Sequence, residues 1–175
     1  MEYVISKTAS AWDSFKSTLL SIMDHIKPRN ILEYGPGIST KIMDSYGFVE
    51  SIDSVEHDEA WYEKYRNNFT PRVFMILEQD LEKYPTVISH IGRYYDLIFI
   101  DGRERERCLD YAPKILKPNG IILLHDSERP AYKSYIDKYS YVFFTDNGHT
   151  VVLTNDKITS EILNKILYED SLSRA

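Results

Sequence analysis

The stretch from Ile31 to Thr40 decides the fold, and it reads Ile-Leu-Glu-Tyr-Gly-Pro-Gly-Ile-Ser-Thr. A short apolar run of the kind found in buried strands leads into a turn that contains Gly35 and Gly37, and a helix follows. Glycine lets a backbone adopt positive φ angles and pass close to a ligand. The first turn of the next helix offers N–H groups to an anionic group. The stretch predicts a strand–turn–helix unit that either holds a nucleotide or simply connects two elements.

The same alternation continues along the chain. Apolar runs predict strands at residues 30–34, 49–56, 72–77, 96–100 and 121–124, and a closing pair at 141–145 and 150–153. Apolar spacing and turn residues predict helices at 10–26, 39–46, 58–69, within 81–94, and at 104–116, 130–139 and 158–168. Strands that alternate with helices in this way predict an α/β fold with a mostly parallel sheet and helices on both faces. Ligands of such sheets bind outside the carboxyl ends of the strands.

The composition excludes several classes of protein. The chain has 175 residues, of which 43% are hydrophobic and 27% charged, as in globular domains. Its net charge of −6 argues against a nucleic-acid partner, which requires a basic face. The single cysteine, Cys108, excludes an intrachain disulfide framework. No apolar run approaches the roughly 20 residues of a membrane span, and the first residues lack a signal-peptide pattern, so we expect a cytoplasmic protein with no membrane partner.

No linker-like stretch divides the chain. We therefore expect one domain over residues 1–175. Within it, residues 1–29 would form an N-terminal helix and lead-in, 30–154 the α/β core, and 155–175 a C-terminal helix.

Two residues of the opening stretch narrow the choice of nucleotide. A dinucleotide-binding fingerprint has a third glycine at position 40, and the Thr40 found there disfavours an NAD-dependent oxidoreductase. Glu33 lies two residues before the first glycine, and a carboxylate at a strand end needs a cation or hydrogen-bond donors. An ammonium or sulfonium group of a ligand would satisfy it, and so would amides of the loop.

Acidic residues also follow the second and third strands. Glu56 ends a strand, where a carboxylate can accept both hydroxyls of a ribose. Asp58 suits the N-cap of the next helix, which leaves Glu56 for the ribose, with His57 beside it. Asp80 follows the third strand and could bind an adenine amino group.

From about residue 30 to residue 153 the chain resembles the class I S-adenosylmethionine-dependent methyltransferases. The resemblance rests on the order and spacing of Leu32–Gly37, Glu56, Tyr95–Gly102 and Leu116–Gly120. It implies a Rossmann-like, doubly wound sheet of seven strands in the order 3-2-1-4-5-7-6, with the seventh antiparallel, and S-adenosylmethionine as the cofactor. The residues expected to bind it are Glu33, Tyr34, Gly35, Pro36, Gly37, Thr40, Glu56, His57, Asp80 and Asp101.

The ends of the fourth and fifth strands carry a second group of polar residues. Parallel neighbours lie about 4.8 Å apart, so Asp101 should lie beside His125 and Asp126. The local pattern is similar to catechol-type O-methyltransferases, which bind a divalent cation here, and to plant polysaccharide O-methyltransferases, which have a His-Asp pair followed by Arg. Ser127 stands where the catechol type has Asn, which weakens the case for Mg²⁺ or Mn²⁺ on Asp101 and Asp126. His125 is the predicted general base; packing at a strand end is its alternative role.

Arginines near this edge are candidates for binding the methyl acceptor. The run from Arg103 to Arg107 alternates Arg with Glu, which is typical of a solvated helix start with self-paired charges. Arg103 directly follows the Asp-Gly corner and could hold a carboxylate or phosphate of the acceptor. Arg129 is the second such candidate.

These residues together predict methyl transfer to a hydroxyl of a small molecule or saccharide by in-line displacement. Asp101 would border the methyl group, while His125 with Asp126 would take the proton. A module that binds the cofactor without catalysis is the alternative, and an NAD-dependent oxidoreductase is a weaker one. The chain shows no separate cap region, so loops or the second subunit of a homodimer would complete the acceptor pocket.

Overall fold

A computed structural model describes residues 15–145 and 148–169 of the chain. Its strands are β1 (Asn30–Tyr34), β2 (Ser51–Glu56), β3 (Val73–Leu77), β4 (Tyr95–Ile100), β5 (Leu116–His125), β6 (Tyr141–Thr145) and β7 (Thr150–Thr154). Its α-helices are α1 (Lys16–His25), α2 (Ile38–Asp44), α3 (Glu59–Tyr65), α4 (Arg105–Tyr111), α5 (Lys133–Ile136) and α6 (Lys157–Asn164). Shorter helical segments are η2 (Tyr84–Ile91), η3 (Ala112–Lys114), η4 (Pro130–Tyr132) and η6 (Lys165–Glu169). Among the described residues, no helix is both long and apolar enough to cross a bilayer.

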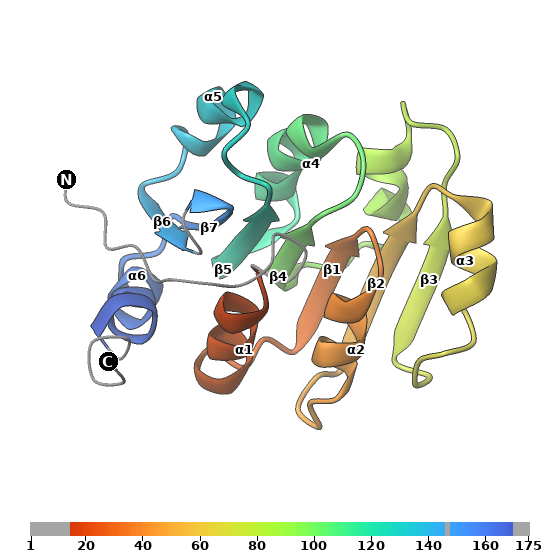
Figure 1. The fold of residues 1–175 in the computed structure, drawn as a ribbon, viewed down its shortest axis with the longest axis horizontal. Coiled ribbons are helices and arrows are strands. Elements are labelled where there is room, and N and C mark those ends of the chain that lie inside the picture. Colours follow the sequence, from red (N-terminus) through yellow and green to blue (C-terminus); the bar gives the residue numbers. More distant parts are fainter. Residues whose placement is uncertain (1–14, 146–147, 170–175) are drawn as a thin grey trace.

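The strands form a single sheet in the order β3-β2-β1-β4-β5-β7-β6 (Figure 1). β1 pairs in parallel with β2 and β4, β2 with β3, and β4 with β5. β7 runs antiparallel to both of its neighbours, β5 and β6. The structure thus confirms the predicted Rossmann-like, doubly wound topology, including the reversed seventh strand.

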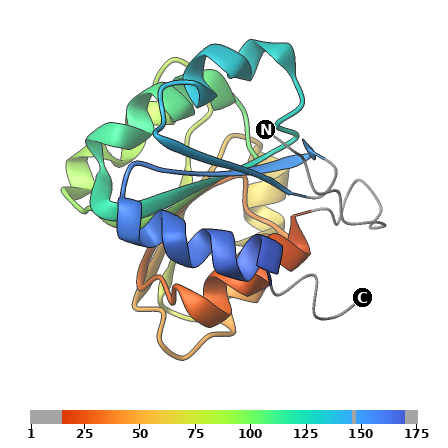
Figure 2. The same cartoon turned by 90° about the vertical axis from the view of Figure 1, so that its left-hand side faces the viewer.

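Helices cover both faces of the sheet, as the edge-on view in Figure 2 shows. One face packs against α1, α2 and α6, with Leu97 and Phe99 of β4 in this layer. The other face packs against η2, α4 and α5, with Ile98 and Ile100 pointing into it. Successive residues of β4 alternate between the two layers, and both layers are apolar. This explains the continuous apolar run in the sequence, because a strand covered on both faces has no solvent side.

The start of β5 departs from the prediction. The sequence predicts this strand at residues 121–124, but β5 already begins at Leu116. Tyr95 pairs with Leu116 and Leu97 with Ile121, so four residues of β5 bulge out opposite one residue of β4. Pro and Gly therefore interrupt the pairing here, as their turn chemistry suggests, without ending the strand.

Several predicted helices are shorter in the structure. The expected helix at 104–116 is divided into α4 and η3, and the expected helix at 130–139 into η4 and α5. The segment after β3 forms a 3₁₀ helix, η2, with Pro85 near its start. α1 lies within the predicted helix at 10–26, of which residues 10–14 fall outside the described residues.

Candidate functional site

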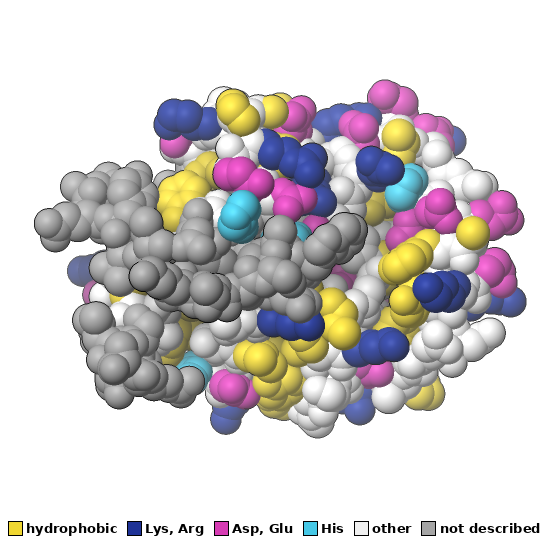
Figure 3. All heavy atoms as spheres, viewed as in Figure 1, with side chains coloured by type: hydrophobic (Ala, Val, Ile, Leu, Met, Phe, Trp, Pro, Cys, Tyr) yellow, Lys and Arg dark blue, Asp and Glu magenta, His cyan; other side chains and the backbone are white. Residues whose placement is uncertain are grey.

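The register of the central strands brings the predicted site residues to one level. Tyr34 of β1 pairs with Ile100 of β4, which in turn pairs with Leu124 of β5. The next residues along these three strands, Gly35, Asp101 and His125, therefore share the carboxyl edge of the sheet. Figure 3 shows acidic, basic and histidine side chains gathered above the ends of these strands.

Gly35 and Gly102 pack their backbones against each other at this edge. Gly35 has a φ of +92°, and a Cβ on it would lie 2.8 Å from the Cα of Gly102. A Cβ on Gly102 would lie 2.2 Å from the hydroxyl oxygen of Tyr84. A larger residue at either position would force the glycine turn and the Asp101–Gly102 corner apart. A Cβ on Gly37, in contrast, would meet no atom of the described residues within 4 Å.

Glu33 is fully buried beneath the glycine turn. Its two carboxylate oxygens accept hydrogen bonds from the hydroxyls of Ser39, Thr40 (2.6 Å) and Ser54 (2.8 Å). The Thr40 hydroxyl also accepts a bond from the Gly37 N–H, at 2.9 Å. Burial raises the pKa of Glu33 to about 7, because the three hydroxyls offset the loss of water only in part. The donors to Glu33 within the described residues are hydroxyls, where the sequence had suggested a ligand cation or loop amides.

Tyr34 faces the core. Its side chain is fully buried, and its hydroxyl donates to the carbonyl oxygen of Pro85 at 2.6 Å. Its own carbonyl accepts from the N–H of Asp101 at 2.9 Å, so its backbone links β1 to the corner after β4.

Glu56 ends β2 with one oxygen engaged. Its Oε1 accepts from the N–H groups of His57 (2.6 Å) and Asp58 (2.8 Å) and lies 2.7 Å from His57 Nδ1. The hydrogen bonds found among the described residues do not use its Oε2. Arg103 Nε lies 3.3 Å from His57 Nε2, which must act as the acceptor, since a guanidinium only donates. Arg103 thus lies beside His57 and Glu56, the residue predicted to bind the ribose. The sequence analysis had instead suggested that Arg103 binds the methyl acceptor.

Asp80 caps a turn at the start of η2. Its Oδ1 accepts from the N–H of Glu82 at 3.0 Å, and its Oδ2 lies 3.1 Å from Lys83 Nζ. The hydrogen bond from Lys83 and the backbone bond from Glu82 lower the pKa of this exposed carboxyl. A capping role accounts for these contacts, and the adenine role remains a prediction.

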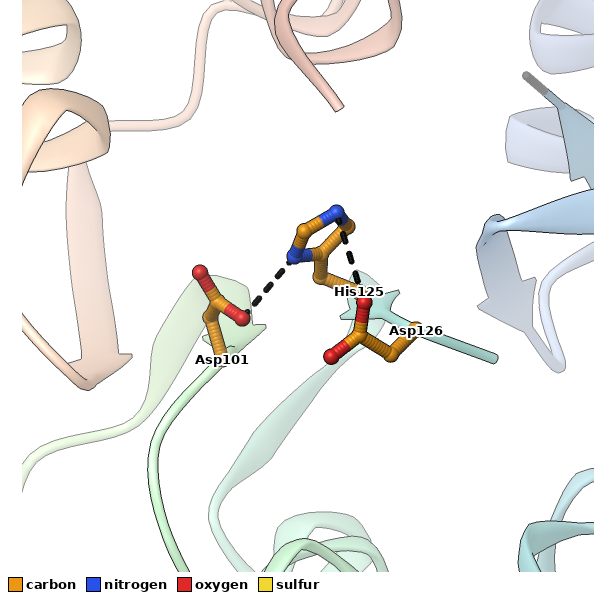
Figure 4. A group of neighbouring side chains, drawn as sticks. All are labelled: Asp101, His125 and Asp126. Carbon is orange, nitrogen blue, oxygen red and sulfur yellow. Dashed lines mark hydrogen bonds and ion pairs between the residues drawn. The ribbon is translucent and has the colours of Figure 1, made fainter. Parts of the chain in front are cut away.

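His125 lies between two carboxylates, as Figure 4 shows. Its Nδ1 is 2.9 Å from Asp101 Oδ1, and its Nε2 is 3.8 Å from Asp126 Oδ1. Burial by itself lowers the pKa of His125, but the hydrogen bond and charge of Asp101 and the charge of Asp126 outweigh it, so the pKa is raised. The ring of Phe15 packs edge-on against the imidazole, with 5.2 Å between centroids.

Arg105 joins the ends of β4 and β5, a role that the sequence analysis missed. Its guanidinium donates to the carbonyl oxygens of Asp101 (2.8 Å), Gly102 (2.9 Å) and His125. It also lies 3.0 Å from Asp101 Oδ1 and 3.1 Å from Asp126 Oδ2, and only 11% of its side chain is exposed. The expectation of a solvated, self-paired run was therefore wrong at this position. The fork shape of the guanidinium allows it to bind both strand ends at once.

Two residues near this edge adopt left-handed backbone conformations without being glycine. Asp126 has a φ of +52° and Glu104 a φ of +47°. Such conformations cost on the order of 1–3 kcal/mol and persist where surrounding contacts hold them. Asp126 is held by Arg105 and by Arg129, whose Nη2 lies 3.0 Å from Asp126 Oδ2. Arg129 keeps 55% of its side chain exposed, so it can also face a ligand.

The carboxylates of the predicted metal site are already paired with arginine side chains of the protein. Asp101, His125 and Asp126 offer ligand atoms within 4.8 Å of one another, which would suit a divalent ion geometrically. However, Arg105 bonds both carboxylates and Arg129 bonds one of them. A metal ion would have to displace these guanidinium groups. As arranged, this donor set does not fit a metal ion.

A cavity of about 390 Å³ lies among η2, α4 and α5, and its lining includes none of the site residues described above. Two of its cations are already paired within the chain. Lys138 Nζ lies 3.0 Å from Asp110, and Arg107 lies 3.1 Å from Glu82. The cavity therefore offers no concentration of unpaired charge for a ligand, and the carboxyl edge is the better candidate site.

Comparison with solved structures finds the same fold in a methyltransferase-like protein, a spermidine synthase and an N-methyltransferase. A methyltransferase-like protein from Silicibacter pomeroyi has a TM-score of 0.67 at 16% identity, with 92% of this chain and 95% of that chain covered. Spermidine synthase from Thermotoga maritima gives a TM-score of 0.60 at 14% identity; the match covers 91% of this chain but only 65% of the synthase. The N-methyltransferase NodS from Bradyrhizobium japonicum gives 0.56 at 12% identity, covering 81% and 92%.

Comparisons of the sequence itself give no match, either with models of protein families or with curated proteins. The structural likenesses therefore establish the fold of class I methyltransferases, and the chemistry has to be argued from the site.

Proposed function

We propose that this chain is an S-adenosylmethionine-dependent methyltransferase that acts on a hydroxyl of a small molecule or saccharide. The observation that carries the proposal is the position of His125, held between two carboxylates at the same carboxyl edge as the Gly35–Gly102 contact. A cofactor seated on the glycine turn would present its methyl group toward this imidazole.

The contacts of His125 suit a general base. When Nδ1 carries the proton and donates a hydrogen bond to Asp101, Nε2 is the basic nitrogen. Nε2 would take the acceptor hydroxyl's proton as the oxygen attacks the methyl carbon and the sulfonium leaves as a neutral thioether. The resulting imidazolium would be stabilised by Asp101 on one side and Asp126 on the other. The proton and charge thus stay within the site.

The cofactor would lie across β1 and β2. Glu56 would receive the ribose hydroxyls, since its Oε1 is fixed by backbone amides and its Oε2 is not used by hydrogen bonds among the described residues. The turn Gly35–Gly37 would accommodate the methionine part, since no atom of the described residues lies within 4 Å of a Cβ placed on Gly37. Arg129, exposed and fixed at its inner end by Asp126, would orient an acidic group of the acceptor.

The experiment separates cofactor binding from chemistry. S-adenosylhomocysteine is titrated calorimetrically into the native protein and into Glu56→Gln, which keeps an oxygen for the backbone amides but loses the charge. We expect wild-type binding in the micromolar range and at least about tenfold weaker binding in the variant. Glu59→Gln, an exposed acid three residues further on, is the matched control and should bind normally.

Turnover tests the base. His125→Asn should bind S-adenosylhomocysteine like the wild type but lose roughly 10²–10⁴ in methyl transfer to a panel of phenols and saccharides, followed with a labelled methyl group. Absence of binding by the wild-type protein would refute the proposal. If the wild type and His125→Asn both bound S-adenosylhomocysteine normally and neither transferred a methyl group to any acceptor, the non-catalytic module would be favoured.

A further inference from the structure

Trp61 makes a contact with the glycine turn that the proposed reaction does not use. Its indole Nε1 donates to the carbonyl oxygen of Pro36 at 2.7 Å, although the two residues lie 25 positions apart. Pro36 is the central residue of the turn between Gly35 and Gly37. Indole has a single donor, and here that donor is directed at the backbone of the turn.

The backbone of Trp61 is fixed to the other half of the proposed cofactor site. The Asp58 carboxylate accepts from the N–H of Trp61 at 2.7 Å, as the N-cap of α3. The N–H of Asp58 in turn donates to Glu56 Oε1 at 2.8 Å. Trp61 is therefore linked through its backbone to the Glu56 loop and through its side chain to the glycine turn.

Core packing does not explain this tryptophan. None of the residues of α3 is buried, and Trp61 itself is 39% exposed. Its ring packs against Tyr65 at an interplanar angle of 41°, with 4.7 Å between centroids, and Lys64 Nζ lies 4.7 Å from its centre. These contacts limit the rotation of the indole and keep its N–H directed at Pro36.

We infer that Trp61 is a positioning residue that fixes the distance between the glycine turn and Glu56. This inference rests on the proposed function, because it assumes that one cofactor spans both parts. A ligand that touches both parts should lose affinity when the link is cut. A ligand that touches only the Glu56 side should not. Turnover at saturating cofactor should change little, since Trp61 contacts neither His125 nor its carboxylates.

The test compares two ligands on Trp61→Phe, which keeps an aromatic ring but removes the donor. S-adenosylhomocysteine spans both parts, whereas 5′-methylthioadenosine has the nucleoside and sulfur but lacks the amino-acid end. We expect about tenfold weaker binding of the first and less than twofold change for the second. Tyr62→Phe, on the same helix, is the matched control and should bind both normally.

Each outcome decides the matter. Equal weakening of both ligands would mean a general structural role, and no weakening of either would mean that the bond is irrelevant; both results overturn the inference. Failure of the wild type to bind S-adenosylhomocysteine would instead refute the proposed function. If Trp61→Phe does not fold, Asp58→Ala cuts the other arm of the link and should show the same selective loss.

Discussion

In the β1–β2 half of the carboxyl edge, acids are held by neutral donors, whereas in the β4–β5 half they are held by cations. Glu33 receives three hydroxyls, and Glu56 receives two backbone amides and the imidazole Nδ1 of His57. Asp101 and Asp126 instead lie about one hydrogen-bond length from the guanidinium of Arg105. In the first half, Glu56 Oε2 is not used by hydrogen bonds among the described residues and can accept polar hydrogens of a ligand. The second half surrounds an imidazole with balanced charge, which suits the movement of a proton.

The difference shows that carboxylates at this edge are held in two ways, by neutral hydrogen-bond donors or by a cation. Hydroxyls leave the pKa of Glu33 at about 7, close to neutrality, even with three of them present. A guanidinium supplies a full opposite charge as well as hydrogen bonds. Substitutions that exchange or remove these two kinds of partner should therefore have effects of different size and pH dependence.

The largest effect is expected from removing the cation. Arg105→Ala would leave two carboxylates and three carbonyl oxygens without their shared donor, and should lower the free energy of unfolding by about 3–5 kcal/mol. Guanidinium chloride unfolding followed by circular dichroism measures this. Arg107→Ala, two positions along α4 with 40% of its side chain exposed, is the control and should cost about 1 kcal/mol or less.

Arg105→Lys sharpens the same comparison. It keeps the charge but cannot bond both strand ends as a fork, so it should remain folded and bind S-adenosylhomocysteine while methyl transfer falls. If Arg105→Ala lowered the free energy of unfolding no more than Arg107→Ala does, the two halves of the edge would not be held differently.

The next largest effect concerns Glu33 and depends on pH. Its pKa rises from 4.5 in the unfolded chain to about 7 in the folded protein, so between these values the folded state binds more protons. The contribution of Glu33 to the free energy of unfolding should then fall by on the order of 3 kcal/mol as pH rises from 4.5 to beyond 7.

Glu33→Gln cannot ionise and should remove that part of the pH dependence. The difference in unfolding free energy between wild type and variant, measured from pH 5 to pH 8.5, should move in favour of the variant as pH rises. A constant difference would contradict the raised pKa. Glu50→Gln, a half-exposed acid paired with Arg29, should leave the slope unchanged.

The sequence could predict the sheet because each strand carries its own signal. The apolar run of β4 and the glycines after β1 are local features, and the order of the strands came with the family resemblance. The candidate residues were found for a similar reason: Glu56 ends a predicted strand, Asp101 and His125 directly follow one, and Glu33 is the last residue but one of another. Topology alone therefore brings them to one edge.

Arg105 could not be found in this way. Its neighbours in the sequence alternate in charge, and such a run is normally solvated. Its partners His125 and Asp126 lie 20 and 21 residues away, and only the tertiary structure shows that the side chain reaches them. The link from Trp61 to Pro36 was missed for the same reason, since a lone exposed tryptophan carries no pattern. Contacts between a helix and a distant turn depend on packing that local spacing does not encode.

The smallest effect is expected from metal ions, and it tests the β4–β5 half directly. If Arg105 and Arg129 neutralise Asp101 and Asp126, then EDTA should change methyl transfer by less than about twofold, and millimolar Mg²⁺ or Mn²⁺ should not raise the melting temperature. A bound ion would stabilise the folded state by mass action, so a concentration-dependent rise would reveal one. A rise that disappears in Asp126→Asn would show that the ion displaces the guanidinium groups and that the carboxylates serve as its ligands. Without such a rise, the charge balance at this edge comes from the protein's own arginines.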